Sequence, residues 1–140
     1  MPIEMKDSDN GLGLIVTGRK IIMENEYLDS YKNQLSQDRG NYKKYRYSLH
    51  DWSEVTDVEV SSDAIGQIAE LCRDFATINP NFIVAHVATL DITYGLSRMW
   101  EVLSDETNWE IMVFRHRKDA EAWIRQQVKE KYEICDLSFS

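Results

Sequence analysis

The alternation of hydrophobic and polar positions predicts a regular succession of strands and helices. Residues 12–16 alternate between apolar and smaller or polar side chains, and an Asn-Gly pair stands just before them. This pair is typical of a tight turn, so residues 3–6 and 12–16 are predicted to form a β-hairpin. Apolar residues then recur at helical spacing from about Glu24, which predicts a first helix.

The middle of the chain predicts a strand and then a long helix. Residues 45–49 alternate between aromatic or apolar and polar side chains, which favours a strand buried on one face, followed by a polar connection over 51–60. Ser61 or Ser62 is a suitable N-cap for the next helix, because a serine side chain can accept a hydrogen bond from a free backbone N–H there. The apolar stripe of this helix continues until the Asn-Pro pair at 79–80 ends it.

The C-terminal half predicts two further strand and helix pairs. Residues 82–88 are almost continuously apolar, as expected of an interior parallel strand covered on both faces. Large apolar residues at helical spacing over 96–103 predict a helix, and residues 109–114 predict another apolar strand. A last helix is predicted to begin near Arg117, with acidic residues in its first turn. Residues 131–140 are predicted to form a C-terminal tail with a short edge strand.

This order of elements defines a fold class. Strands that alternate with helices imply right-handed crossovers and a parallel sheet, to which the hairpin adds one antiparallel strand. We therefore expect an α/β fold with a mixed, mostly parallel sheet of about five strands and four helices. The chain has 140 residues, which matches the commonest size of one domain, so a single domain over 1–140 is expected.

Charge and cysteine content narrow the expected partners. The chain carries 24 acidic and 16 basic residues, a formal net charge of -8, so its average field repels nucleic acids and anionic lipid surfaces. No stretch approaches the ~20 apolar residues that span a bilayer, so we expect no membrane insertion and a cytoplasmic location. Cys72 and Cys135 are the only cysteines and neither belongs to a CxxC pair, which argues against a zinc site or a disulfide framework.

Several segments resemble a known family. They are residues 82–88, the stretch Tyr-Gly-Leu-Ser-Arg-Met-Trp-Glu over 94–101, the strand over 109–115 and the helical segment over 119–124. The order of elements over 3–132 resembles STAS domains, and these segments resemble the SpoIIAA-like branch, also called STAS/SEC14-like, of bacterial proteins of unknown function. The resemblance implies a STAS-like fold and a cytoplasmic, non-catalytic regulatory or binding module.

The resemblance also implies a phosphorylation candidate. In signalling STAS proteins, a partner kinase phosphorylates a serine at the start of the helix after the third strand. By position this serine would be Ser61 or Ser62, although residues 58–64 lack the Asp-Ser-Ser/Thr-Gly signature. A phosphate there would meet the partial positive charge of a helix N-terminus. The alternative is an unmodified pair of N-cap serines.

The strand ends predict a binding rim. In parallel α/β sheets, ligands bind beyond the carboxyl ends of the strands, because crossover loops and helix N-termini converge there. The expected strand ends bring imidazoles, carboxylates and guanidiniums to one edge, which suits an anion or another small ligand. The ligand-binding candidates are Arg19, His50, Asp51, Asp91, Arg115 and His116.

A metal site is an alternative at the same rim. His50, Asp51, Asp91 and His116 carry ligand atoms that suit a divalent metal, but none of them has the short helical spacing of a metal motif. Neither cysteine has a histidine nearby in the sequence, and no serine lies in a GxSxG elbow. No catalytic residue and no cofactor are therefore predicted.

Two further features fall inside predicted elements. His86 lies within an apolar strand, where a neutral imidazole needs hydrogen-bond partners, and we predict a satisfied core histidine. Tyr94 and Arg98 share one face of the helix after that strand. If Met99 or Trp100 of this helix is partly exposed, it offers an apolar surface to a protein partner or to the second subunit of a homodimer; packing in the core is the alternative.

The leading hypothesis is a non-catalytic regulatory or binding module. It would engage a protein partner or a small ligand at the carboxyl-end edge of the sheet. One alternative is a phosphorylatable switch at Ser61 or Ser62. The other is a small metal- or anion-dependent enzyme that uses the histidines and carboxylates of the rim.

Overall fold

Strands and helices alternate along the chain as the hydrophobic pattern predicts. A computed structural model describes residues 3–37 and 41–140. The strands are β1 (Ile3–Ser8), β2 (Gly13–Met23), β3 (Tyr47–Glu59), β4 (Ile83–Val87) and β5 (Glu110–Phe114). The helices are α1 (Glu24–Gln37), α2 (Ser62–Ile78), α3 (Asp91–Leu103) and α4 (Arg117–Tyr132).

The strands form one five-stranded sheet in the order β1-β2-β3-β4-β5. β1 is antiparallel to β2, and each of the other neighbouring pairs is parallel. The turn between β1 and β2 contains Asn10 and Gly11, whose φ angles are 58° and 88°, in the region that an Asn-Gly pair adopts readily. The predicted α/β class with a mixed, mostly parallel sheet is therefore confirmed.

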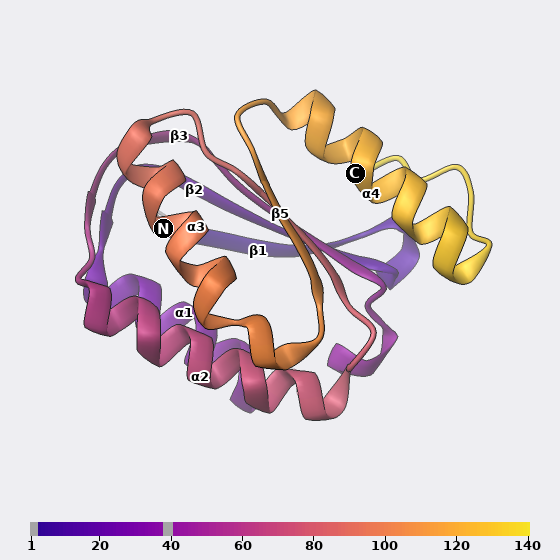
Figure 1. The fold of residues 1–140 in the computed structure, drawn as a ribbon, viewed down its shortest axis with the longest axis horizontal. Helices are drawn as coiled ribbons and strands as arrows, with labels where there is room; N and C mark the ends of the chain where they lie inside the picture. Colours follow the sequence, from indigo (N-terminus) through magenta and orange to yellow (C-terminus); the bar gives the residue numbers. More distant parts are fainter. Residues whose placement is uncertain (1–2, 38–40) are drawn as a thin grey trace.

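The two faces of the sheet carry two separate cores. On one face, strand residues such as Val16 and Val84 pack with apolar residues of α1, α2 and α3. On the other face, residues such as Leu49 and Ala85 pack with α4 and the C-terminal segment. Figure 1 shows α1 and α2 together on one side of the molecule and α4 with the C-terminus on the other. Among the described residues, no helix combines the length and the apolar composition that crossing a membrane requires.

The predicted polar connection over 51–60 is wrong, because β3 continues to Glu59. The distal half of β3 pairs with the equally long β2, as far as the pair Met23 and Glu59. Trp52 and Val55 of this half are buried, whereas Ser53 and Glu54 are exposed. Polar side chains are tolerated there because solvent reaches part of the strand while its backbone bonds to β2.

The C-terminal tail is not a strand, which corrects the predicted edge strand. Helix α4 extends to Tyr132, and residues 133–140 have no regular secondary structure. The tail is held by burial of Leu137 and Phe139 in the second core. The Asp9 carboxylate also accepts hydrogen bonds from the backbone N–H groups of Ser138 and Phe139, at 2.7 and 3.2 Å. Side-chain burial and this carboxylate therefore replace ladder hydrogen bonds.

Candidate ligand-binding site

His50 does not lie in an exit loop, which corrects its placement at a strand end. It lies inside β3, and its side chain is 5% exposed. Its Nδ1 lies 2.9 Å from the hydroxyl of Tyr31 in α1, and its Nε2 lies 2.6 Å from the hydroxyl of Ser48. Both ring nitrogens are therefore occupied by protein hydroxyls on the face covered by α1.

Asp51 belongs to the opposite face of the same strand, because successive side chains of a strand alternate. Its carboxylate accepts a hydrogen bond from Arg117 at the start of α4, at 3.1 Å, and another from the backbone N–H of Ser53, at 2.9 Å. Arg117 also pairs with Glu121 of α4, at 2.8 Å. Asp51 is thus a buried carboxylate that anchors α4, and it lies on the other side of the sheet from the His50 imidazole.

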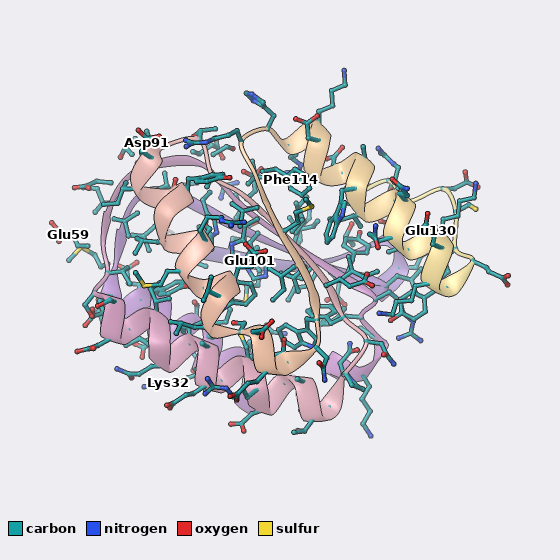
Figure 2. All side chains as sticks on the ribbon, in the orientation of Figure 1. Lys32, Glu59, Asp91, Glu101, Phe114 and Glu130 are labelled. Atoms are coloured by element: carbon teal, nitrogen blue, oxygen red, sulfur yellow. The ribbon has the colours of Figure 1, made fainter. Side chains whose placement is uncertain are left out.

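Three of the remaining rim candidates, Arg19, Asp91 and Arg115, form exposed ion pairs. Arg115 pairs with Asp91 at 3.0 Å and lies over the ring of Tyr94, 4.1 Å from its centroid. Arg19 pairs with Glu54 at 3.2 Å. Figure 2 labels Asp91 at the start of α3, where it is exposed to solvent. In such exposed pairs the two charges neutralise each other, and the pair contributes little to the stability of the fold.

The structure does not bring the four proposed metal ligands together, which corrects the metal-site alternative. His50 and Asp51 point to opposite faces of the sheet, and Asp91 is paired with Arg115. His116 is exposed at the N-cap of α4 and makes no capping hydrogen bond. Over residues 3–37 and 41–140, no group of three or more histidine, cysteine or acidic side chains is placed to hold a metal ion.

The structure instead pairs His50 with His86 of the neighbouring strand. The two residues are direct partners in the parallel register of β3 and β4. Their rings stack with centroids 4.5 Å apart and an angle of 4° between their planes. Burial lowers the pKa of His50 from 6.5 to about 3. Burial, and then the neighbouring His50, lower the pKa of His86 well below its ordinary value. Both imidazoles are therefore neutral near pH 7.

The proton of His86 can be assigned from its neighbour Trp52. The indole Nε1 of Trp52 lies 3.1 Å from Nδ1 of His86. An indole N–H can only donate, so Nδ1 must accept and the neutral ring carries its proton on Nε2. Nε2 is buried and has no hydrogen-bond partner among the described residues. The prediction of a fully satisfied core histidine is therefore wrong for one of the two nitrogens.

A small pocket lies beside this imidazole, toward the carboxyl ends of β2 and β3. Its volume is about 40 Å³, counted as the space open to the centres of water-sized molecules, which is room for roughly three waters or a small organic group. Much of the lining is aliphatic and comes from β2, from β3 and the residue that follows it, and from α2 and α3. These aliphatic residues are Ile22, Val55, Val58, Val60, Ile65 and Leu96.

The polar and aromatic part of the lining consists of six more residues, none of them formally charged at neutral pH. Thr93 and Ser97 face the pocket from α3, and the Thr93 hydroxyl donates to the carbonyl of Leu90 at 2.9 Å. Aromatic rings complete the wall. The aromatic and imidazole residues are Tyr27, Trp52, His86 and Trp100. The arrangement suits an uncharged, largely apolar guest with one group that accepts a hydrogen bond.

The pocket residues of β3 escaped the sequence analysis because this segment was predicted to be a connection. Trp52, Val55 and Val58 recur every three residues rather than alternating. The register of β2 and β3 shifts twice, between Thr17 and Arg19 and between Lys20 and Ile21, and such irregularities change which side chains face the core. Two features of the sequence could have indicated this site: the large apolar residues within 51–60 and the histidine in an apolar strand.

The serine pair has a clear structural role. Ser61 is the N-cap of α2, and its hydroxyl accepts a hydrogen bond from the backbone N–H of Ala64 at 3.2 Å. The Glu24 carboxylate accepts the backbone N–H of Ser61 at 2.8 Å. Ser61 and Ser62 are both exposed. Because the Glu24 carboxylate already bonds to the N-cap residue of α2, a phosphate on Ser61 would be repelled by its negative charge. Phosphorylation at either serine stays a prediction.

The partner-surface candidates on α3 differ in their exposure to solvent. Trp100 is 2% exposed and belongs to the first core, so its proposed surface role is wrong. Met99 is 37% exposed. Arg98 pairs with Glu101 at 2.8 Å, and Tyr94 contacts Arg115. Exposed apolar side chains do continue along α3. They include Ile92, Met99, Val102 and Leu103. A partner on this face stays a prediction.

Comparison with known proteins identifies the fold. No family model matches the chain, and no curated protein matches it. Among solved structures, the chain is similar to an uncharacterized protein of the DUF3478 family from Shewanella loihica PV-4, which is described as having a SpoIIAA-like fold. The two share 18% sequence identity, the match covers 87% of this chain and 91% of the other, and the TM-score is 0.55. The chain therefore has a SpoIIAA-like fold, and the STAS-like fold expected from the resemblance is confirmed.

Proposed function

We propose that this protein is a non-catalytic binding module that holds a small, largely apolar molecule in the pocket between α2, α3 and the sheet. The observation that carries the proposal is the pocket itself: its walls are aliphatic and aromatic, and two buried nitrogens of its lining residues, Nε2 of His86 and Nε1 of Trp100, have no hydrogen-bond partner among the described residues. Ligand sites commonly combine an apolar lining with a few polar groups that orient the guest.

The chemistry of the nearby side chains favours binding over catalysis. Both imidazoles are buried and neutral, so neither takes up a proton readily near neutral pH. Burial raises the pKa of the Cys72 thiol to about 12, so its nucleophilic thiolate is not formed near pH 7. The position of the pocket, toward the carboxyl ends of β2 and β3, is where parallel sheets commonly bind ligands. A module that recognises a molecule without transforming it fits these features.

The proposal can be tested with a variant that fills the pocket. Val58 lines the pocket and is only partly buried, so Val58→Phe adds bulk there with little disturbance of the core. Val102 is 68% exposed on α3 and does not line the pocket, which makes Val102→Phe the matched control. The measurement is an NMR titration with 2-methyl-1-butene, followed through the amide and methyl signals of pocket residues.

We expect saturable shifts in the natural protein and in Val102→Phe, and affinity at least ten-fold weaker in Val58→Phe. The added phenyl ring fills the pocket, so the probe can no longer bury its apolar surface there. The proposal is overturned if neither 2-methyl-1-butene nor butan-2-one, the ketone of the same shape, gives saturable shifts in the natural protein. Equal binding by Val58→Phe and the control would overturn it as well, because the probe would then occupy another place.

A further inference from the structure

The buried donor beside the pocket limits the chemistry of the ligand. Trp52 donates to Nδ1 of His86 at 3.1 Å, which leaves the proton on Nε2. The ring cannot easily turn, because it stacks on His50 at 4.5 Å and lies 4.6 Å from the ring of Trp100. Nε2–H is therefore a donor of fixed direction on a residue that lines the cavity, and it has no partner among the described residues.

Charge excludes some acceptors for this donor. In the part of the chain that the structure describes, no lysine or arginine lines the pocket, and His86 is neutral. An anionic guest would lose its hydration without gaining a counter-charge, which is strongly unfavourable in an apolar site. A neutral acceptor such as a carbonyl oxygen gives up much less hydration and still pairs with the N–H.

We infer that the pocket binds a small neutral carbonyl compound, such as a ketone, ester or amide, whose oxygen accepts the Nε2–H of His86 while its carbon skeleton contacts the aliphatic wall. This inference rests on the proposed function, because it names the ligand class of the same pocket. The interaction adds specificity: an apolar molecule of the same shape fills the space but leaves the imidazole donor unpaired.

Three probes of equal size separate these possibilities. Butan-2-one and 2-methyl-1-butene differ only in C=O against C=CH₂, and propanoate replaces the ketone with an anion. The informative variant is His86→Asn, because an asparagine oxygen can still accept the Trp52 N–H near the position of Nδ1 but provides no donor near Nε2. Dissociation constants of the probes are measured by NMR titration of the natural protein and of the variant.

We expect His86→Asn to lower the ratio of ketone to alkene affinity by roughly three- to ten-fold, the value of one neutral hydrogen bond. In the natural protein, the ¹⁵N and ¹H signals of His86 Nε2 should shift when butan-2-one binds and stay in place when 2-methyl-1-butene binds. Propanoate should give no saturable shift at pH 7. The imidazole signals provide the answer even if the variant does not fold.

The outcomes distinguish the two proposals. If both uncharged probes bind but the affinity ratio and the Nε2 signals are unchanged, the ligand class is wrong and the proposed function stands. If neither probe binds, the proposed function fails and this inference fails with it. Tight binding of propanoate would also overturn the assignment of a neutral acceptor.

Discussion

His50 and His86 occupy the same level of two neighbouring strands, but only His50 has partners at both ring nitrogens. Tyr31 and Ser48 serve its two nitrogens, whereas His86 has Trp52 at one nitrogen and the pocket beside it. Burial is the main cause of the neutral state of both rings, and for His86 the neighbouring His50 adds to it. An unpaired donor beside a cavity, rather than a buried histidine as such, therefore indicates a binding site.

The largest effect should be the pH dependence of stability, because burial lowers the pKa of both rings. Between pH 6.5 and about 3, His50 is neutral in the folded protein but protonated in the unfolded chain, and the lowered pKa of His86 has the same sign. The unfolded state then binds more protons, so stability falls as pH falls. From pH 7 to pH 5 we expect a loss of roughly 2 kcal/mol from His50 and a further loss of the same sign from His86.

Urea unfolding at pH 7, 6 and 5 measures this effect. His50→Phe should have a weaker pH dependence than the natural protein, since one of the two buried imidazoles is then absent. A natural protein whose stability is constant over this interval would contradict the burial of neutral rings.

The second test is the cost of removing each ring at pH 7. In His50→Phe, two buried hydroxyl groups lose the imidazole as a partner, and we expect a loss of about 2–4 kcal/mol. In His86→Phe, the Trp52 N–H loses its acceptor, but an unpaired donor is removed as well, so we expect about 1 kcal/mol. Denaturant titrations of the two variants decide the order. Equal losses would show that Nε2 of His86 is satisfied after all.

The smallest effect should come from the charged rim at the start of α3. Asp91→Asn breaks the pair with Arg115, but the Asp91 side chain is 98% exposed. We expect a change within about 0.5 kcal/mol in the free energy of unfolding, and unchanged affinity for the apolar probe. Weaker binding in this variant would show that the charged rim takes part in ligand binding, which would weaken the contrast between the two histidines.

Much of the fold could be predicted from local patterns. The apolar stripe of α2, its cap at Ser61 and its end before Pro80 follow from rules that act within one or two turns of a helix. The continuously apolar segment around β4 predicted an interior strand. The distal half of β3 could not be recognised, because its pairing partner Gly13–Met23 lies more than twenty residues earlier in the chain.

The candidate site was predicted less well, for a related reason. The rim hypothesis grouped side chains by their position after predicted strand ends. Because the predicted end of β3 was wrong, His50 was placed in a loop, whereas it lies in the core. Gly18 illustrates what the sequence conceals: a side chain there would collide with the ring of Trp52. This glycine has a packing role in placing the indole that fixes the proton of His86.

By itself, the sequence determined the order of strands and helices, the two-sided burial of β4 and the acidic surface, because each depends on residue type and short-range spacing. It did not predict the burial of β3 on both faces, since residues 45–49 alternate as in a strand buried on one face. Only the tertiary structure decided that His50 and His86 stack, that Trp52 assigns the proton of His86 and that a pocket opens beside it. These contacts join side chains far apart in the chain, and their geometry depends on strand register, which a shift of one residue reverses.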